Sequence, residues 1–275
     1  MTRAWALVGL SVVVSGCLDR LFYYPDGRDY GSPTSYRLKH EEVSFPSADG
    51  TRLSGWFLPA VGEPRGTVVH AHGNAANISN HFHGVVFLPP ARFNVLVFDY
   101  RGFGRSEGAP TRAGCVADVN AALDYVRTRP DVARGKVGLF GQSLGGALSI
   151  VVGAARTDVA AVAAEAAFTS HRELAREVLR LSPLAPLAGP LSRLLTSEYA
   201  PLEVVDRISP RPLLLLHGDR DALIPLSMSR ELLARAGEPK ALHVVEGGQH
   251  LHVPEGAARV AYERVLVDFF AHAFQ

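Results

Sequence analysis

The sequence has little cysteine, no excess of charge of one sign and no long hydrophobic run, and each shortage excludes a class of protein. Two cysteines among 275 residues can form at most one disulfide, so the chain is not a disulfide-stapled scaffold. Lys and Arg number 28 against 27 Asp and Glu, and a net charge of +1 leaves no global basic field for nucleic acid. A hydrophobic content of 47% with 20% charged residues is typical of a folded globular chain rather than a disordered one.

The first residues carry the features of an export signal. Arg3 precedes an apolar run over residues 4–14, which is shorter than the roughly 20 residues that span a bilayer but suits a signal-peptide core. The run ends in Val14-Ser15-Gly16-Cys17. An ordinary secretory signal or a buried first helix is the alternative, although the polar stretch that follows argues against a buried helix.

This ending resembles the lipobox of bacterial lipoproteins. The resemblance implies that residues 1–16 are removed, that Cys17 takes a diacylglyceryl group, and that the protein is anchored in the bacterial cell envelope, facing the periplasm or the exterior. Residues 17–40 are then a lipidated tether. We expect its aromatic cluster, Phe22-Tyr23-Tyr24, to pack on the surface of the domain rather than to line a site.

From residue 41 to 275 the chain alternates strand and helix, which predicts one α/β domain. A hairpin with the turn Asp49-Gly50 opens it, and later short apolar runs fit strands buried on both faces. Strands that alternate with helices indicate a mostly parallel sheet covered by helices on both faces. The proline- and leucine-rich stretch over residues 169–210 breaks the rhythm and is interpreted as a small helical cap. The predicted strands are residues 67–72, 94–98, 136–140, 160–164, 213–217 and 242–246, and the predicted helices are residues 114–127, 144–155, 226–236 and 255–272.

Gly141-Gln142-Ser143-Leu144-Gly145 is the sharpest chemical motif. It follows an apolar strand and opens a helix rich in Gly and Ala, which is the setting of a nucleophile elbow. The glycines allow a tight turn that leaves the serine hydroxyl exposed near a helix N-terminus. We therefore predict that Ser143 is a nucleophile and that the Leu144 N–H is one donor of an oxyanion hole.

The other loops supply the remaining groups. The Asn74 N–H, after the predicted strand 67–72, is the expected second oxyanion donor, although Asn74 could simply cap the next helix. His250 follows Gly247-Gly248 and is the expected base. Asp221 is the expected acid that orients it.

Three other residues are alternatives to the assignments of Asp221 and His250. Asp219 competes with Asp221, but it lies in the tight turn, where it is expected to bind local backbone N–H groups. Glu165, at the end of another strand, is an outside alternative for the acid. His252 is the alternative to His250.

The chain resembles an α/β-hydrolase of the small serine-hydrolase branch that includes depalmitoylase-like and serine-aminopeptidase-like members. Besides the elbow, the supporting strings are residues 72–77 (HGNAAN), 99–106 (DYRGFGRS), 217–221 (HGDRD) and 248–250 (GQH). The order Ser143, Asp221, His250 is that of this superfamily. The resemblance implies a structural role for residues 99–106. Ala76 stands where relatives often carry Gly, and could narrow the oxyanion loop.

The sequence therefore predicts a serine hydrolase that cleaves a carboxylic ester or thioester and needs no cofactor. A peptidase of the same fold and a non-catalytic envelope-binding lipoprotein are the alternatives. A metal hydrolase based on His70, His72, His81 and His83 is disfavoured, because that loop offers no carboxylate ligand. Cys115 is expected to be a buried, inert thiol.

Mass spectrometry of the mature protein is expected to show an N-terminus at a diacylated Cys17. Each buried CH₂ of an acyl chain contributes about 0.8 kcal/mol to membrane binding, so Cys17→Ser should release the protein from membranes. An unmodified N-terminus elsewhere, on a protein found free of membranes, would instead show plain secretion.

Overall fold

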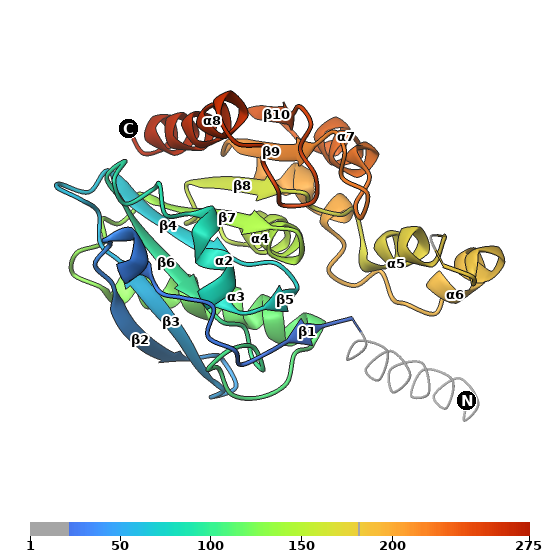
Figure 1. Cartoon of the computed structure of the whole chain (residues 1–275), viewed down its shortest axis with the longest axis horizontal. Coiled ribbons are helices and arrows are strands. Elements are labelled where there is room, and N and C mark those ends of the chain that lie inside the picture. Colours follow the sequence, from blue (N-terminus) through green and yellow to red (C-terminus); the bar gives the residue numbers. More distant parts are fainter. Residues whose placement is uncertain (1–21, 181) are drawn as a thin grey trace.

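The computed structural model describes residues 22–180 and 182–275. The export signal and Cys17 lie outside the described residues. An eight-stranded sheet, in the order β10-β9-β8-β7-β4-β6-β3-β2, forms the centre of the molecule (Figure 1). All pairs from β10 to β6 are parallel, whereas β2 and β3 add an antiparallel edge. The predicted α/β-hydrolase fold, with a mostly parallel sheet and helices on both faces, is confirmed.

The strands and helices keep the predicted order, with bounds that shift by one or two residues. The strands of the main sheet are β2 (Glu41–Pro46), β3 (Arg52–Leu58), β4 (Gly66–Ala71), β6 (Phe93–Phe98), β7 (Val137–Gln142), β8 (Ala161–Glu165), β9 (Leu213–Gly218) and β10 (Lys240–Val245). A separate two-stranded sheet pairs β1 (Tyr24–Pro25) with β5 (Ala75–Ala76). The helices are α2 (Ile78–His81), α3 (Arg112–Thr128), α4 (Leu144–Ala155), α5 (His171–Arg180), α6 (Ala188–Ser192), α7 (Leu226–Arg235) and α8 (Ala257–Ala273).

The central strands divide the hydrophobic core into two halves because alternate side chains point to opposite faces of the sheet. In β4, Val69 belongs to the half that packs on α3, α4 and α7, and Val68 belongs to the half that packs on α2 and α8. β10 differs from the expectation of a strand buried on both faces: it is the edge strand, and Val244 is exposed. No helix among the described residues is long and apolar enough to cross a membrane.

The loop after β6 is structural, as the family resemblance implied. The Arg101 guanidinium donates to Asp118 on α3 at 2.7 Å and to Asp49 in the β2–β3 turn at 2.7 Å. The Asp99 carboxylate accepts hydrogen bonds from the amides of Ile78 (2.8 Å) and Arg105 (3.3 Å), and burial raises the pKa of this carboxyl to about 6. These contacts tie the loop to three neighbouring segments.

The helices α5 and α6 lie between β8 and β9 in sequence and project away from the sheet (Figure 1). Because β8 ends at the same edge as β7, this insertion rises from the edge where the elbow lies. Of the stretch 169–210 that the sequence predicts as a cap, we refer to residues 171–198 as the cap, because Val205 and Ile208 near its end are buried in the core.

The described part of the lead-in packs on the domain instead of forming a free spacer. Tyr23 is buried in the core, with its ring against Phe103, and Leu38 is also buried. Tyr24–Pro25 runs parallel to Ala75–Ala76. Aromatic and aliphatic side chains bring this segment onto the domain despite its polar composition, because their burial removes apolar surface from water.

Candidate active site

Ser143 lies at the sharp turn between β7 and α4, in a strained backbone conformation with φ 55° and ψ −112°. Two flanking glycines make the turn possible. A Cβ at Gly145 would lie 1.9 Å from the carbonyl oxygen of Ala71, and one at Gly141 would lie 2.0 Å from the carbonyl oxygen of Gly145. The glycine spacing of the motif is therefore a packing requirement, and the predicted elbow geometry is present.

The side chains of Ser143, His250 and Asp221 form one hydrogen-bonded chain. The Ser143 Oγ lies 3.1 Å from His250 Nε2, and His250 Nδ1 lies 2.8 Å from Asp221 Oδ2. With Nδ1–H donating to the carboxylate, Nε2 is free to accept the serine proton. The structure thus brings together, from three loops, the three side chains that the sequence singled out.

Asp221 is fixed by further contacts. Its Oδ1 accepts hydrogen bonds from the amides of Leu223 and Ile224, both at 2.9 Å. The buried His217, which sequence reasoning did not single out, donates from Nε2 to the carbonyl of Ile224 at 2.8 Å and lies 3.5 Å from Asp221 Oδ2. Burial raises the pKa of Asp221, but the contacts with His217 and His250 and the Ile224 amide outweigh it and hold the pKa well below its ordinary value. Asp221 is therefore an anion that faces the imidazole.

The alternatives to Asp221 and His250 are engaged elsewhere. The Asp219 carboxylate accepts a hydrogen bond from a backbone amide, as expected, but the donor is Gly247 in the loop after β10, at 2.7 Å, rather than an amide of its own turn. His252 forms an isolated bridge with Gln249, in which the Gln249 amide donates to the His252 carbonyl at 3.0 Å. Neither side chain joins the hydrogen-bonded chain to Ser143.

Glu165, at the end of β8, holds the elbow through hydrogen bonds instead of orienting His250. Its backbone carbonyl accepts a hydrogen bond from the Ser143 amide at 2.8 Å. Its carboxylate accepts from Gln142 Nε2 and from the Tyr262 hydroxyl, each at 2.7 Å, and Gln142 Oε1 accepts from His70 Nε2 at 3.0 Å. Burial raises the pKa of Glu165. Sequence reasoning missed this network; its one signal was a polar Gln142 beside a predicted buried strand.

The loop that carries Asn74 lies between the elbow and the His250 loop. A Cβ on Gly73 would lie 3.3 Å from Leu251 Cδ1 and 3.8 Å from the carbonyl oxygen of Gln142. Leu144 is the first residue of α4, so its N–H is one of those that a helix leaves without an internal acceptor. The two proposed donor residues, Leu144 and Asn74, therefore belong to segments that border the serine.

Asn74 does not cap the following helix, so that alternative is wrong. The N-cap of α2 is Asn77, whose Oδ1 accepts from the Ser79 amide at 2.9 Å. The Asn74 side-chain amide instead donates to the backbone carbonyl of Phe22. Ala76 adopts a φ of 57°, a left-handed conformation that glycine adopts more readily than alanine.

The lead-in segment holds the Asn74 loop through backbone hydrogen bonds. The Tyr24 amide donates to the Asn74 carbonyl at 3.2 Å, and the Asp26 amide donates to the Ala76 carbonyl at 3.3 Å. The Asn77 side-chain amide adds donations to the backbone carbonyls of Asp26 (3.1 Å) and Arg28 (2.8 Å). Residues 22–28 are thus part of the framework of the candidate oxyanion loop, which the sequence did not predict.

The four clustered histidines serve separate structural contacts. His72 Nδ1 donates to the Gly73 carbonyl at 2.7 Å, His81 Nε2 donates to the Ala75 carbonyl at 2.7 Å, and His83 Nδ1 accepts from Tyr36 at 2.8 Å. Burial lowers the pKa of His70 to about 3 and lowers those of His72 and His81. Over residues 22–180 and 182–275, no group of three or more potential ligands could hold a metal ion. Cys115 is buried, and burial raises its pKa.

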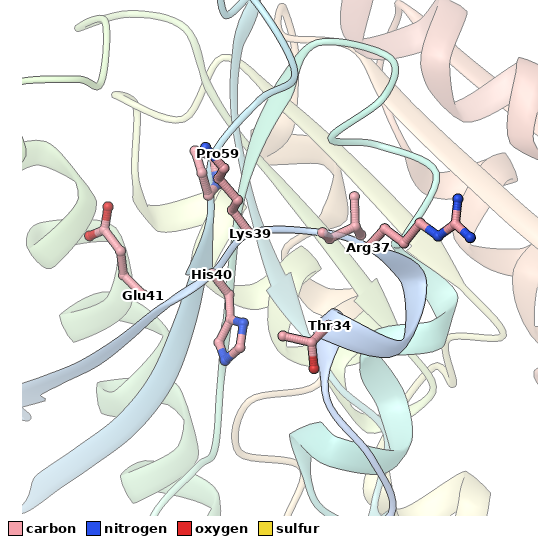
Figure 2. Close-up of a pocket in the computed structure, with 7 residues that line it drawn as sticks. Thr34, Arg37, Lys39, His40, Glu41 and Pro59 are labelled. Atoms are coloured by element: carbon pink, nitrogen blue, oxygen red, sulfur yellow. The ribbon is translucent and has the colours of Figure 1, made fainter.

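A surface hollow away from these side chains offers no comparable chemistry. Figure 2 shows it between the lead-in and the start of β2, with Arg37, Lys39 and Glu41 on its rim. It contains none of the three hydrogen-bonded residues, and its charges have mixed sign. The candidate site is therefore the edge of the sheet where Ser143 lies.

Comparison with known proteins places this geometry in a family. Residues 62–200 match the family model described as serine aminopeptidase, S33. The chain is 39% identical over 258 residues to the uncharacterized protein YfhR of Escherichia coli K12, covering 92% of this chain and 87% of the relative. Protein bem46 of Schizosaccharomyces pombe is 27% identical over 281 residues, covering 97% and 91%.

Among solved structures, an esterase of Pyrococcus furiosus, Pf2001, superposes with a TM-score of 0.76 at 21% identity. The match covers 92% of this chain and 98% of the esterase. At this identity the likeness concerns the fold, which the two chains share over nearly their whole length.

Proposed function

Since this chain belongs to the α/β-hydrolases, in the family described as serine aminopeptidase S33, we propose that it is a serine hydrolase that cleaves a carboxylic ester or thioester through an acyl-serine intermediate. One observation carries the proposal: the hydrogen-bonded chain from Asp221 through His250 to Ser143. This is the arrangement that activates a serine hydroxyl for nucleophilic attack.

The first half of the reaction follows from these contacts. His250 Nε2 takes the proton of Ser143 as Oγ attacks the carbonyl carbon, and Asp221 stabilises the imidazolium that forms. The amides of Leu144 and Asn74 stabilise the negative charge on the carbonyl oxygen. The tetrahedral intermediate collapses, His250 returns the proton to the leaving alcohol or thiol, and the acyl group stays on Ser143.

Water then completes the cycle. His250 accepts a proton from the water that attacks the acyl carbon. As the second tetrahedral intermediate collapses and the bond to Oγ breaks, His250 returns this proton to Ser143 Oγ and the carboxylic acid leaves. Every step uses side chains and amides of this chain. No metal or cofactor enters the proposal.

Two observations support an ester or thioester over a peptide bond. The cap that rises from the edge of the site is rich in leucine and offers apolar surface to an acyl chain. The solved structures that share the fold include Pf2001, an esterase. The family description names an aminopeptidase, so a paired assay with p-nitrophenyl acyl esters and aminoacyl p-nitroanilides decides between the two classes of substrate. Faster turnover of the anilides would reject the ester assignment.

Ser143→Ala is expected to abolish turnover of p-nitrophenyl esters and labelling by a fluorophosphonate, with the fold preserved. Loss of the nucleophile of a triad costs on the order of 10⁶ in kcat. Thermal unfolding of the variant is the control for its fold. Retention of more than a tenth of the parent activity would refute the role of Ser143.

Asp221→Asn is expected to reduce kcat far more than Asp219→Asn. An amide in place of the orienting carboxylate can lower kcat by about 10⁴ because it favours the wrong tautomer of the histidine. Asp219→Asn is the matched control, since an Asn oxygen can still accept from the Gly247 amide. A larger loss at position 219 would show that the two acids have the opposite roles.

Tyr24→Pro tests whether the lead-in holds the oxyanion loop. Proline removes the amide that donates to the Asn74 carbonyl, whereas Tyr24→Ala keeps this amide and removes only an exposed side chain. We expect the proline variant to lose up to about 10²-fold in kcat, the lower end of the effect of losing one oxyanion donor. KM should change little, and the alanine variant should match the parent. Equal kinetics of the two variants would show that the loop does not depend on this hydrogen bond.

A further inference from the structure

The tip of the cap carries an exposed apolar surface. Its residues follow α5 or belong to α6 and the turns beside it, and we call them the cap patch: Pro183, Leu184, Ala185, Pro186, Leu187, Pro190 and Leu194. The exposed fractions of the three leucines are 48% for Leu184, 51% for Leu187 and 55% for Leu194. Large exposed apolar patches on a water-soluble surface mark sites of interaction with a protein or a membrane.

The charges around the cap patch suit an anionic surface. Arg193 is the one charged residue in the sequence from 182 to 197, and it is exposed; Glu198, also exposed, follows at the end of the cap. The nearest acids on α5, Glu173 and Glu177, lie 3.5 Å and 3.2 Å from Arg176 and Arg180, which balance their charge. An apolar surface whose own charge is basic matches the interface of a bilayer that contains anionic lipids.

The described chain begins beside this same cap. The Phe22 ring packs edge-on against His171, the first residue of α5, with the ring centroids 5.9 Å apart. Cys17 lies five residues earlier, and five residues span at most about 18 Å even when fully extended. The proposed lipid anchor at Cys17 therefore joins the described chain next to the start of α5.

We propose that the cap patch docks on the surface of a phospholipid bilayer. The N-terminal segment brings the membrane to the cap, and the leucines of the patch insert into the interface. The cap and Ser143 share the edge of the sheet formed by β7 and β8, where Gln142 pairs with Glu165. Docking through the patch thus turns this edge, rather than the opposite one, toward the bilayer (Figure 1).

The test places a tryptophan in the patch of the full chain, incorporated into vesicles of phosphatidylcholine and phosphatidylglycerol. Leu187→Trp is the main reporter and Leu194→Trp is a second, in case one variant fails to fold. Val61→Trp is the matched control, because Val61 is also an exposed apolar side chain, at 61%, but lies in the loop between β3 and β4. Emission is compared between vesicles with brominated and with ordinary acyl chains, after subtraction of the parent signal.

We expect both cap reporters to lose emission in the brominated vesicles and Val61→Trp to keep its emission. The proposal is overturned if neither cap reporter is quenched while the protein remains on the vesicles, or if Val61→Trp is quenched equally. Blue-shifted but unquenched cap reporters, together with dimers in sedimentation experiments, would also overturn it, because a second copy of the chain would then cover the patch. None of these outcomes depends on the proposed catalytic activity.

Discussion

The constraint on which the site depends is the strained turn at Ser143. A residue with a side chain at φ 55° and ψ −112° costs on the order of 1–3 kcal/mol and persists only where its surroundings hold it. Two contacts hold the turn: Gly145 packs against the carbonyl of Ala71, and the Glu165 carbonyl accepts a hydrogen bond from the Ser143 amide. The turn is therefore fixed by both neighbours of β7, so the position of Ser143 is set by the whole parallel sheet rather than by its own loop.

The same sheet explains how residues distant in sequence meet. The carboxyl ends of parallel strands lie at one edge, so the loops after β7, β9 and β10 converge there although they span more than a hundred residues. Asp221 and Asp219 differ in the backbone amides from which their carboxylates accept hydrogen bonds. The Leu223 and Ile224 amides fix one carboxylate toward His250, and the Gly247 amide holds the other away.

Much of the fold and the arrangement of Ser143, Asp221 and His250 could be predicted because both leave local signals. Apolar runs mark the central strands, and glycine spacing marks the elbow. The Glu165–Gln142–Tyr262 network left only the polar Gln142 as a local signal, because neither Glu165 nor Tyr262 lies in a motif that points to its partner. The contact between His217 and Asp221 was missed for a related reason. In the HGDRD string, nothing distinguishes a histidine that contacts the acid from a buried histidine that does not.

The lipobox resemblance predicts a tether over residues 17–40, and neither that resemblance nor composition reports backbone pairing. The hydrogen bonds that join Tyr24 and Asp26 to the loop of Asn74 use main-chain amides and carbonyls, which carry no mark of residue type. The side chains of Tyr23, Pro33 and Leu38, buried among mostly exposed neighbours, also hold the segment on the domain. The same short segment, residues 22–28, therefore contacts two parts of the domain: the loop of Asn74, through the Tyr24 and Asp26 amides, and the loop after β6, where the Gly104 amide donates to the Asp26 carbonyl at 3.1 Å. In the proposed lipoprotein, this segment joins the anchor to the loop of Asn74.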